Sequence, residues 1–313
     1  MADLSVCAGI DAGTRESKLA YSDGLGTRII ARLEGFDLLA LREESEAYFD
    51  EPVFSCVVAS DSRVRPENSG FSDVHVIPQS EAVILGLGRD EKNIVCDFGE
   101  SAFRMYVVNA HEVIDAETVS DVCGKVIDEN FAEYLAERYC FRMSDSEVMH
   151  EARRIKHALT DNEITSWRER DIYRYELERV IHFPVKRSAR TLQRLVRVHK
   201  PEGVILTGGS IKIPEVRRVI SDVLGISPEY RGNLIAEGAA VKARELQRDN
   251  ARAKRPDNAA RLRELRAKML ELEDRLTRRQ KDRVYAIFRQ AEGINDAGII
   301  TLMENMMHEI RSV

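Results

Sequence analysis

The sequence contains little of what marks disulfide-stapled or secreted proteins. Only 5 of its 313 residues are cysteine, an odd number, and none of them forms a C-x-x-C pair. Cys7, Cys56 and Cys96 lie inside apolar runs, where cysteine behaves as a small hydrophobic residue. We therefore expect free, buried cysteines and a reducing compartment.

Long apolar runs and an excess of positive charge are absent as well. No run approaches the roughly 18 apolar residues that a membrane span needs, and no signal-like region precedes the first expected strand. The 47 basic residues are outnumbered by 53 acidic ones, giving a net charge of −6, and no basic stripe typical of nucleic-acid binding is evident. These absences predict a cytoplasmic protein that neither spans a membrane nor binds nucleic acid.

What is present is a strong alternation of apolar and charged residues. Hydrophobic residues make up 43% and charged residues 32%, the latter above the roughly 25% usual in soluble proteins. Because the charges interleave with apolar residues, amphipathic helices explain this excess better than disorder. The length allows one large or two ordinary domains.

The periodicity predicts a mixed α/β chain. The expected strands are 6–10, 18–21, 28–33, 53–59, 75–79, 93–99, 103–108, 111–115 and 203–209. The expected helices are 37–49, 81–88, 122–140, 144–159, 184–199, 214–224 and 235–246, with Pro184 opening one of them. The stretch 167–181 has no clear type, and the polar stretch after Leu246 is interpreted as a linker.

A weak internal repeat is present. The segments VCAGIDAG (6–13) and NIVCDFG (93–99) are both apolar strands that end in Asp-x-Gly and are followed by another strand. Asp11 matches Asp97, and Gly13 matches Gly99. Such self-similarity suggests two similar lobes that face one another.

The paired Asp-x-Gly turns indicate a polyphosphate site. Glycine lets the backbone approach a ligand closely, and successive amides in such a turn attract phosphate oxygens. An aspartate there would contact Mg²⁺ through water, in the hydrated coordination that this ion prefers. Each turn alone is typical of an ordinary hairpin, but two of them followed by LTGGS (206–210) favour a nucleotide site.

Five segments resemble one protein family, in the family's order. They are GIDAGTRESKLAYSD (9–23), VHVIPQSEAVILGLG (74–88), VCDFGESAFRMYVV (95–108), VILTGGSIKIPEVRRVI (204–220) and LIAEGAAVKAREL (234–246). They resemble the nucleotide-binding domain of the heat shock protein 70 family (DnaK-type chaperones), within the actin-like ATPase superfamily. The resemblance covers about 1–247 and implies a two-lobed α/β fold of the ribonuclease H-like type. Lobe I would be about 1–90 plus 234–248, and lobe II about 91–233, with a linker and C-terminal helical segment at 249–313.

The resemblance also implies a set of site residues. Asp11 and Asp97 would hold hydrated Mg²⁺, and Gln79 would orient the attacking water for ATP hydrolysis. Lys18 would contact phosphate, as in the actin branch, and ARRIKHALT (152–160) would place Lys156 at the ribose and His157 where a stacking arginine usually stands. The nucleotide-binding residues implied in this way are Gly13, Thr14, Arg15, Lys18, Gly99, Glu100, Ser101, Lys156, His157, Gly208, Gly209, Ser210 and Gly238.

The second phosphate turn departs from the family pattern. Glu100 and Ala102 stand where the family usually has glycines and then threonine, and a carboxylate beside the γ-phosphate would repel it. The family's catalytic lysine has no recognisable counterpart, and neither has the peptide-binding β-sandwich. The resemblance therefore implies nucleotide binding with slow or absent ATP hydrolysis.

The C-terminal residues carry two apolar stripes at helical spacing, Leu262–Leu276 and Ile299–Ile310. They predict helices that pack on the lobes, on a second copy or on a protein partner. Two functions stay open: a nucleotide-driven switch that signals to a partner through lobe closure and the helical tail, and an actin-like filament-forming subunit. A sugar or acetate kinase of the same superfamily would need an acceptor pocket that the sequence does not indicate.

Overall fold

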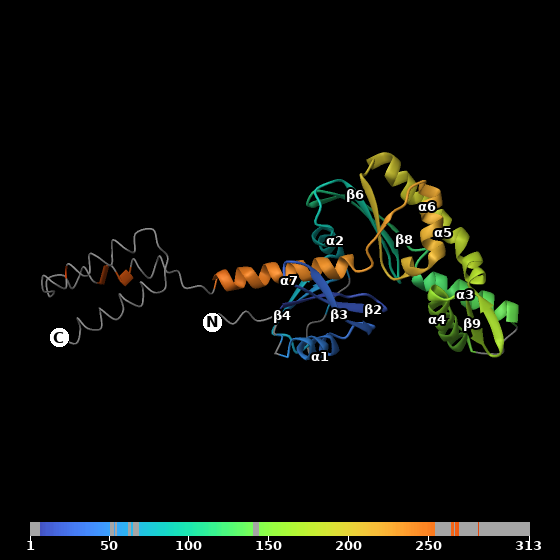
Figure 1. The fold of residues 1–313 in the computed structure, drawn as a ribbon, viewed down its shortest axis with the longest axis horizontal. Helices are drawn as coiled ribbons and strands as arrows, with labels where there is room; N and C mark the ends of the chain where they lie inside the picture. The colour runs from blue at the N-terminus through green and yellow to red at the C-terminus, as the bar shows by residue number, and fades with distance from the viewer. Residues whose placement is uncertain are drawn as a thin grey trace. The chain divides into compact units, whose positions relative to one another are not determined.

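Two five-stranded sheets form the framework of the computed structural model (Figure 1). It describes residues 7–253 except 51–52, 54, 62–63, 65–68 and 140–143, together with 264–265, 267–268 and 281. The chain divides into two compact units, Asp3–Gln247 and Arg248–Val313, the latter with Met1–Ala2. Both sheets belong to the first of these units.

The two sheets have the same strand order. The first is β3-β2-β1-β4-β5, with the strands β1 (Cys7–Asp11), β2 (Glu16–Ser22), β3 (Thr27–Glu34), β4 (Ser55–Ala59) and β5 (Asp73–Ile77). The second, given from the matching edge, is β8-β7-β6-β11-β12, with the strands β6 (Asn93–Phe98), β7 (Phe103–Asn109), β8 (Glu112–Val119), β11 (Gly203–Thr207) and β12 (Glu229–Tyr230). In the first sheet, β1 pairs antiparallel with β2 and parallel with β4. In the second sheet, β6 pairs in the same way with β7 and β11. The internal repeat in the sequence is therefore a repeat of structure.

Helices cover these sheets in three layers. They are α1 (Leu38–Phe49), α2 (Gln79–Leu87), α3 (Gly124–Tyr139), α4 (Asp145–Asp161), α5 (Arg174–His199), α6 (Pro214–Leu224) and α7 (Leu234–Ala253). α1 packs on one face of the first sheet, and α3, α4, α5 and α6 share the core on the far face of the second sheet. α2 and α7 lie between the sheets, where one core joins Val57, Val95, Ala82 and Ala239 (Figure 1). Because strands such as β6 are buried on both faces, they read as continuous apolar runs.

Local signals in the sequence explain where several helices begin and end. Asp37 caps α1, because its side chain accepts hydrogen bonds from the amides of Leu39 and Ala40. Pro214 occupies the first turn of α6, where its missing amide hydrogen costs nothing. Gly88 closes α2 with φ at 59°. The helices expected at 37–49, 81–88 and 214–224 are confirmed.

Two predictions of local structure are wrong, and one stretch that was left open now has a structure. Pro184 does not open a helix, because α5 begins at Arg174 and an unbroken apolar stripe continues through the proline. The stretch of unclear type, 167–181, takes in the end of β9 (Ile164–Trp167), the whole of β10 (Arg170–Tyr173) and the first residues of α5; β9 and β10 form an antiparallel hairpin. The expected linker is helical in its first part, since α7 continues to Ala253 through a stretch in which Gln, Arg and Ala, all good helix formers, outnumber Asp249 and Asn250. The stripes Leu262–Leu276 and Ile299–Ile310 lie almost wholly outside the described residues.

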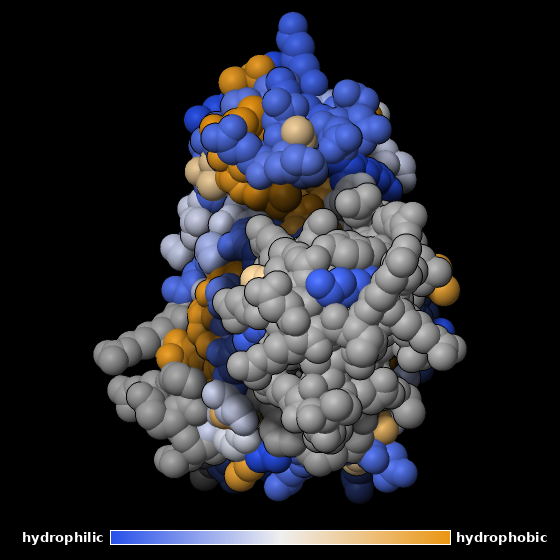
Figure 2. Space-filling view, turned by 90° about the vertical axis from the view of Figure 1, so that its left-hand side faces the viewer, coloured by the Kyte–Doolittle hydropathy of each residue, from blue (hydrophilic) through white to orange (hydrophobic). Residues whose placement is uncertain are grey.

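The predicted burial of cysteine is confirmed. Cys7, Cys56 and Cys96 are free and buried, as is Cys123. Figure 2 shows mostly hydrophilic residues on the described surface of one face, with smaller apolar groups between them. Among the described residues, no helix combines the length and apolar character needed to cross a membrane.

Candidate functional site

The two Asp-x-Gly turns lie at equivalent ends of the two sheets. Asp11 ends β1, and Asp97 lies one residue before the end of β6. The amide of Gly13 donates to the carbonyl of Asp11 at 3.0 Å, and the amide of Gly99 donates to that of Ala102 at 3.0 Å. These two glycine amides therefore close the turns, and amides offered to a phosphate must come from the residues that follow them.

A cavity of about 480 Å³ lies between the lobes and is lined by both turns. This volume is typical of a small-molecule site. All predicted site residues line it except Gly238: Asp11, Gly13, Thr14, Arg15, Lys18, Gln79, Asp97, Gly99, Glu100, Ser101, Lys156, His157, Gly208, Gly209 and Ser210. The structure thus brings together segments that are far apart in the chain. Their roles toward a ligand stay predictions.

Gly238 lies elsewhere. It is on α7, and a Cβ atom built there would be 1.8 Å from the carbonyl oxygen of Ala82 on α2. Its role is the close approach of two helices beside the cavity. The motif resemblance could not separate this packing role from ligand contact, because glycine serves both.

Gly208 positions the strand end next to Asp97. Its φ is 95°, and a Cβ atom would lie 2.6 Å from Oδ1 of Asp97. A side chain here would displace the carboxylate, so glycine is required both by the left-handed backbone and by the space. The LTGGS segment therefore leaves room for the Asp97 carboxylate as well as lining the cavity.

Asp11 and Asp97, together called the acidic corner of the cavity, each lie near a cationic side chain. Lys18 Nζ is 3.5 Å from Asp11 Oδ2 and also donates to the carbonyl of Gly232 at 3.2 Å. Arg104 Nη1 is 3.9 Å from Asp97 Oδ2. Both carboxylates are buried, and this burial raises the pKa of each.

The pKa of Asp97 rises to about 6. Burial is the main cause, and the charge of Asp11 adds to it, while the guanidinium of Arg104 opposes it. A divalent cation between the two carboxylates would favour the ionised form of both. The two cations of the corner, Lys18 and Arg104, therefore do not offset the effect of burial on the pKa of Asp97.

The residues present fit a hydrated Mg²⁺ ion. This ion commonly uses one or two carboxylates, keeps several waters and takes phosphate oxygens as further ligands. No cluster of three or more His, Cys, Asp or Glu side chains suited to a metal occurs in the described part of the chain. Gln79 Oε1, which is buried, has no hydrogen-bond partner among the described residues. A water or ligand in the cavity could supply that partner.

Among the cavity residues that were not predicted from the sequence, Asp61 and Arg104 are charged and lie beside predicted site residues. Asp61 follows β4, and its Oδ1 accepts a hydrogen bond of 2.9 Å from the amide of Gln79. Its Oδ2 is 3.6 Å from Nε of Arg104 on β7. The signal available was an aspartate just after a buried strand and a charged residue inside an otherwise apolar one.

Glu100 faces a cation and a helix start. Its Oε1 is 3.9 Å from Nη1 of Arg15. Its other carboxylate oxygen would lie 2.3 Å from a Cβ atom on Gly124, the first residue of α3. A helix N-terminus favours negative charge, so the surroundings offset part of the charge that was expected to repel phosphate.

Asp128, which is fully buried on α3, joins the lobes. Arg15 from the first lobe donates to its Oδ2 at 3.0 Å, and Arg153 from α4 donates to the same oxygen at 2.9 Å. Lys156 contacts the other oxygen. Lys156, predicted at the ribose, is therefore held by a carboxylate at the cavity wall.

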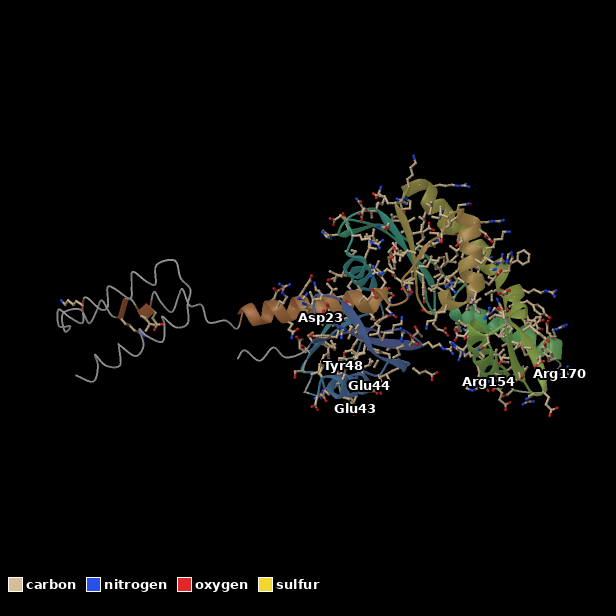
Figure 3. All side chains as sticks on the ribbon, viewed as in Figure 1. Asp23, Glu43, Glu44, Tyr48, Arg154 and Arg170 are labelled. Atoms are coloured by element: carbon tan, nitrogen blue, oxygen red, sulfur yellow. The ribbon has the colours of Figure 1, made fainter. Side chains whose placement is uncertain are left out.

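His157 lies next to Lys156 on α4. Burial lowers its pKa, and the charge of Lys156 lowers it further. A neutral imidazole offers a flat ring without charge, which suits stacking. By contrast Arg154 of α4 and Arg170 of β10, labelled in Figure 3, are outside the cavity lining and lie at the outer part of the second lobe.

The mixed α/β architecture with two five-stranded sheets, and the cavity lined by both Asp-x-Gly turns, are compatible with a two-lobed ATPase fold. No family model matches the chain. It is similar to chaperone protein HscA homologs, at 24% identity in Delftia acidovorans (71% of this chain, 42% of the relative) and 25% in Acidovorax ebreus (77% and 45%). A third, from Acidithiobacillus ferrooxidans, is 27% identical (54% and 32%).

The chain spans less than half the length of these curated relatives. The similarities support a distant relationship with chaperones of the heat shock protein 70 family. This agrees with the resemblance seen in the motifs.

Proposed function

We propose that the chain is an adenine-nucleotide-binding switch of the heat shock protein 70 type, with Mg-ATP bound in the interlobe cavity. The observation that carries this proposal is the convergence of two structurally equivalent Asp-x-Gly turns on one cavity. The similarity to chaperone protein HscA homologs supports it independently.

The residues of the chain divide the work between metal, phosphate and base. Asp11 and Asp97 hold the hydrated Mg²⁺ ion, which offsets the charge of the phosphates when it is bound. Lys18 contacts phosphate from the first lobe. Gln79 orients a water through its unpartnered Oε1, and the neutral ring of His157 stacks on the adenine.

Hydrolysis in this proposal is slow. Glu100 adds negative charge to the second phosphate turn, and Arg15 at 3.9 Å offsets it only in part. A carboxylate charge and a phosphate charge about 4 Å apart at intermediate dielectric repel each other by about 4 kcal/mol. The proposed output is lobe closure that a partner protein reads. The ion pair between Arg15 of the first phosphate turn and Asp128 of α3 supports this output, because a ligand at the turn would act on Arg15.

Calorimetric titration of the full chain with ATP, ADP and AMP, with and without Mg²⁺, tests this function. We expect Mg-ATP to bind more tightly than metal-free ATP, and Asp97→Asn to weaken Mg-ATP more than metal-free ATP because it removes charge near the metal. Asp222→Asn, on the exposed face of α6, is the control and should change neither. Absence of adenine-nucleotide binding by the wild type would refute the function, and equal losses in both forms would remove Asp97 from the metal site.

A further inference from the structure

The structural repeat places a cation opposite each of the two cavity aspartates. In the first sheet, Asp11 on β1 pairs directly with Lys18 on β2. In the second sheet, Asp97 on β6 pairs directly with Arg104 on β7. Since β1 and β6, and likewise β2 and β7, hold the same places in their sheets, Arg104 is the structural counterpart of Lys18.

The guanidinium of Arg104 lies where it can serve a ligand. The side chain lines the cavity and is 24% exposed. Its nearest anions are Asp61 Oδ2 at 3.6 Å and Asp97 Oδ2 at 3.9 Å. Both distances exceed those of normal N–H···O hydrogen bonds, about 2.7–3.2 Å. Electrostatics hold the group in place, while its donors are not committed to these oxygens at hydrogen-bonding distance.

Asp61 fixes the direction of this arginine. Asp61 belongs to the first lobe, and its other oxygen is held by the amide of Gln79 at the start of α2. The pair Arg104–Asp61 therefore crosses from one lobe to the other, beside the residue predicted to orient water. Lys18 from the first sheet and Arg104 from the second both line the cavity that a phosphate chain would enter.

We propose that Arg104 binds the terminal phosphate oxygens of the nucleotide, as the second-lobe counterpart of Lys18. The proposal rests on the proposed function of the same cavity and names the group that reads the phosphate chain. Guanidinium has five donors in a planar fork that matches phosphate oxygens, which an ammonium group cannot reproduce. The fixed positive charge of Arg104 also offsets Asp97 and Asp61 when phosphate approaches them.

The length of the phosphate chain is the readout that separates this role from a structural one. We expect Arg104→Gln to weaken ATP binding about tenfold or more, the size of a lost charge-assisted hydrogen bond. ADP should lose less and AMP should bind as in the wild type, all by calorimetric titration of the full chain. Arg104→Lys keeps the charge, so its affinity for ATP should lie between that of the wild type and that of Arg104→Gln.

Arg42→Gln is the matched control. Arg42 is equally exposed, at 25% of its side chain, and also pairs with a carboxylate, Glu46 on the same helix, but it is outside the cavity lining. It should leave the affinities for all three nucleotides unchanged. If Arg104→Gln lowers thermal stability while the ratio of ATP to AMP affinity stays at the wild-type value, Arg104 only joins the lobes and the proposal is wrong.

A measurement on the wild type covers the case in which Arg104→Gln does not fold. Phenylglyoxal labelling followed by mass spectrometry should modify Arg104 in the free protein and much less with saturating ATP, while AMP gives no protection. Equal labelling with and without ATP would overturn the proposal. Failure of the proposed function looks different, because the wild type itself would then bind none of these nucleotides.

Discussion

At the scale of single residues, burial of like charges dominates the site. Asp97 is buried beside Asp11, and its pKa of about 6 stands well above the ordinary value of 3.8. Keeping two carboxylates ionised there costs stability unless a cation is bound. The site is thus arranged for ligand binding rather than for the stability of the free protein.

This arrangement predicts how stability depends on pH in the absence of metal and nucleotide. Between about pH 4 and 6 the folded state holds a proton on Asp97 that the unfolded state has released. Its contribution to stability is present below pH 4 and is lost as pH rises through 6. Because the pKa of Asp97 is higher by about two in the folded state than in the unfolded state, ionisation of Asp97 lowers the free energy of unfolding by about 3 kcal/mol. Asp97→Asn should therefore gain up to that much over the wild type at pH 7.5, and much less at pH 4.5.

Denaturant unfolding in a chelator at several pH values measures this difference. Asp222→Asn on the surface of α6 serves as the reference for removing a charge without burial. A constant difference between Asp97→Asn and the wild type across this range would contradict the assignment.

Much of the cavity could be predicted from the sequence of single segments. The part that could not be predicted consists of contacts between residues from different strands. Asp11 and Asp97 carry their own signal, a glycine two positions after a strand-ending aspartate. Arg104 and Asp61 carry only a weak signal within their own segments, and their contact with each other forms between residues that lie far apart in the chain. The pairing of Asp97 with Arg104 becomes visible only once the second sheet is aligned with the first.

At the scale of elements, α7 is packed so closely that its neighbours leave no room for a Cβ atom. A Cβ on Gly238 would lie 1.8 Å from the Ala82 carbonyl on α2, and one on Gly9 of β1 would lie 2.1 Å from the Ala240 amide on α7. These contacts join backbone to backbone. They cannot be relieved by a change of rotamer.

Gly238→Ala should therefore destabilise the protein by about 1–3 kcal/mol, the usual cost of overpacking, because α2 and α7 must separate. Gly26→Ala is the control, since a Cβ there meets nothing within 4 Å. Thermal unfolding of both variants measures the effect. A stability of Gly238→Ala equal to that of Gly26→Ala would show that the helices separate without cost.

The elements predicted from periodicity are mostly right in type, and the errors have physical causes. Pro184 predicts a helix start because proline normally cannot continue a helix. In α5 the apolar residues Leu177, Ile181 and Val185 are all buried against the second sheet's core, and this packing outweighs the lost hydrogen bond. Tertiary burial thus overrides a local signal.

At the scale of the whole molecule, every described residue that lines the cavity precedes the C-terminal segment. Removing residues 254–313, with the cut after Ala253 so that α7 stays whole, should leave ATP affinity within about twofold, because none of these lining residues is lost. Calorimetric titration of the shortened and full chains measures this, and light scattering compares their masses.

A mass that halves on truncation would assign self-association to the removed segment. An unchanged association state would leave that segment to a protein partner or to the chain's own lobes. Loss of folding or of nucleotide binding would contradict the expectation that residues 254–313 form a separate interaction segment.

The placement of α2 and α7 between the sheets has a consequence for folding. Their core includes Val57 from the first sheet and Val95 from the second, so neither sheet can complete its inner face alone. The two halves are alike in topology, yet each would expose a large apolar surface if it folded by itself. We therefore expect the unit that holds both sheets, Asp3–Gln247, to unfold cooperatively, with the most slowly exchanging amide hydrogens in α2, in the part of α7 within this unit and in the strands that touch them.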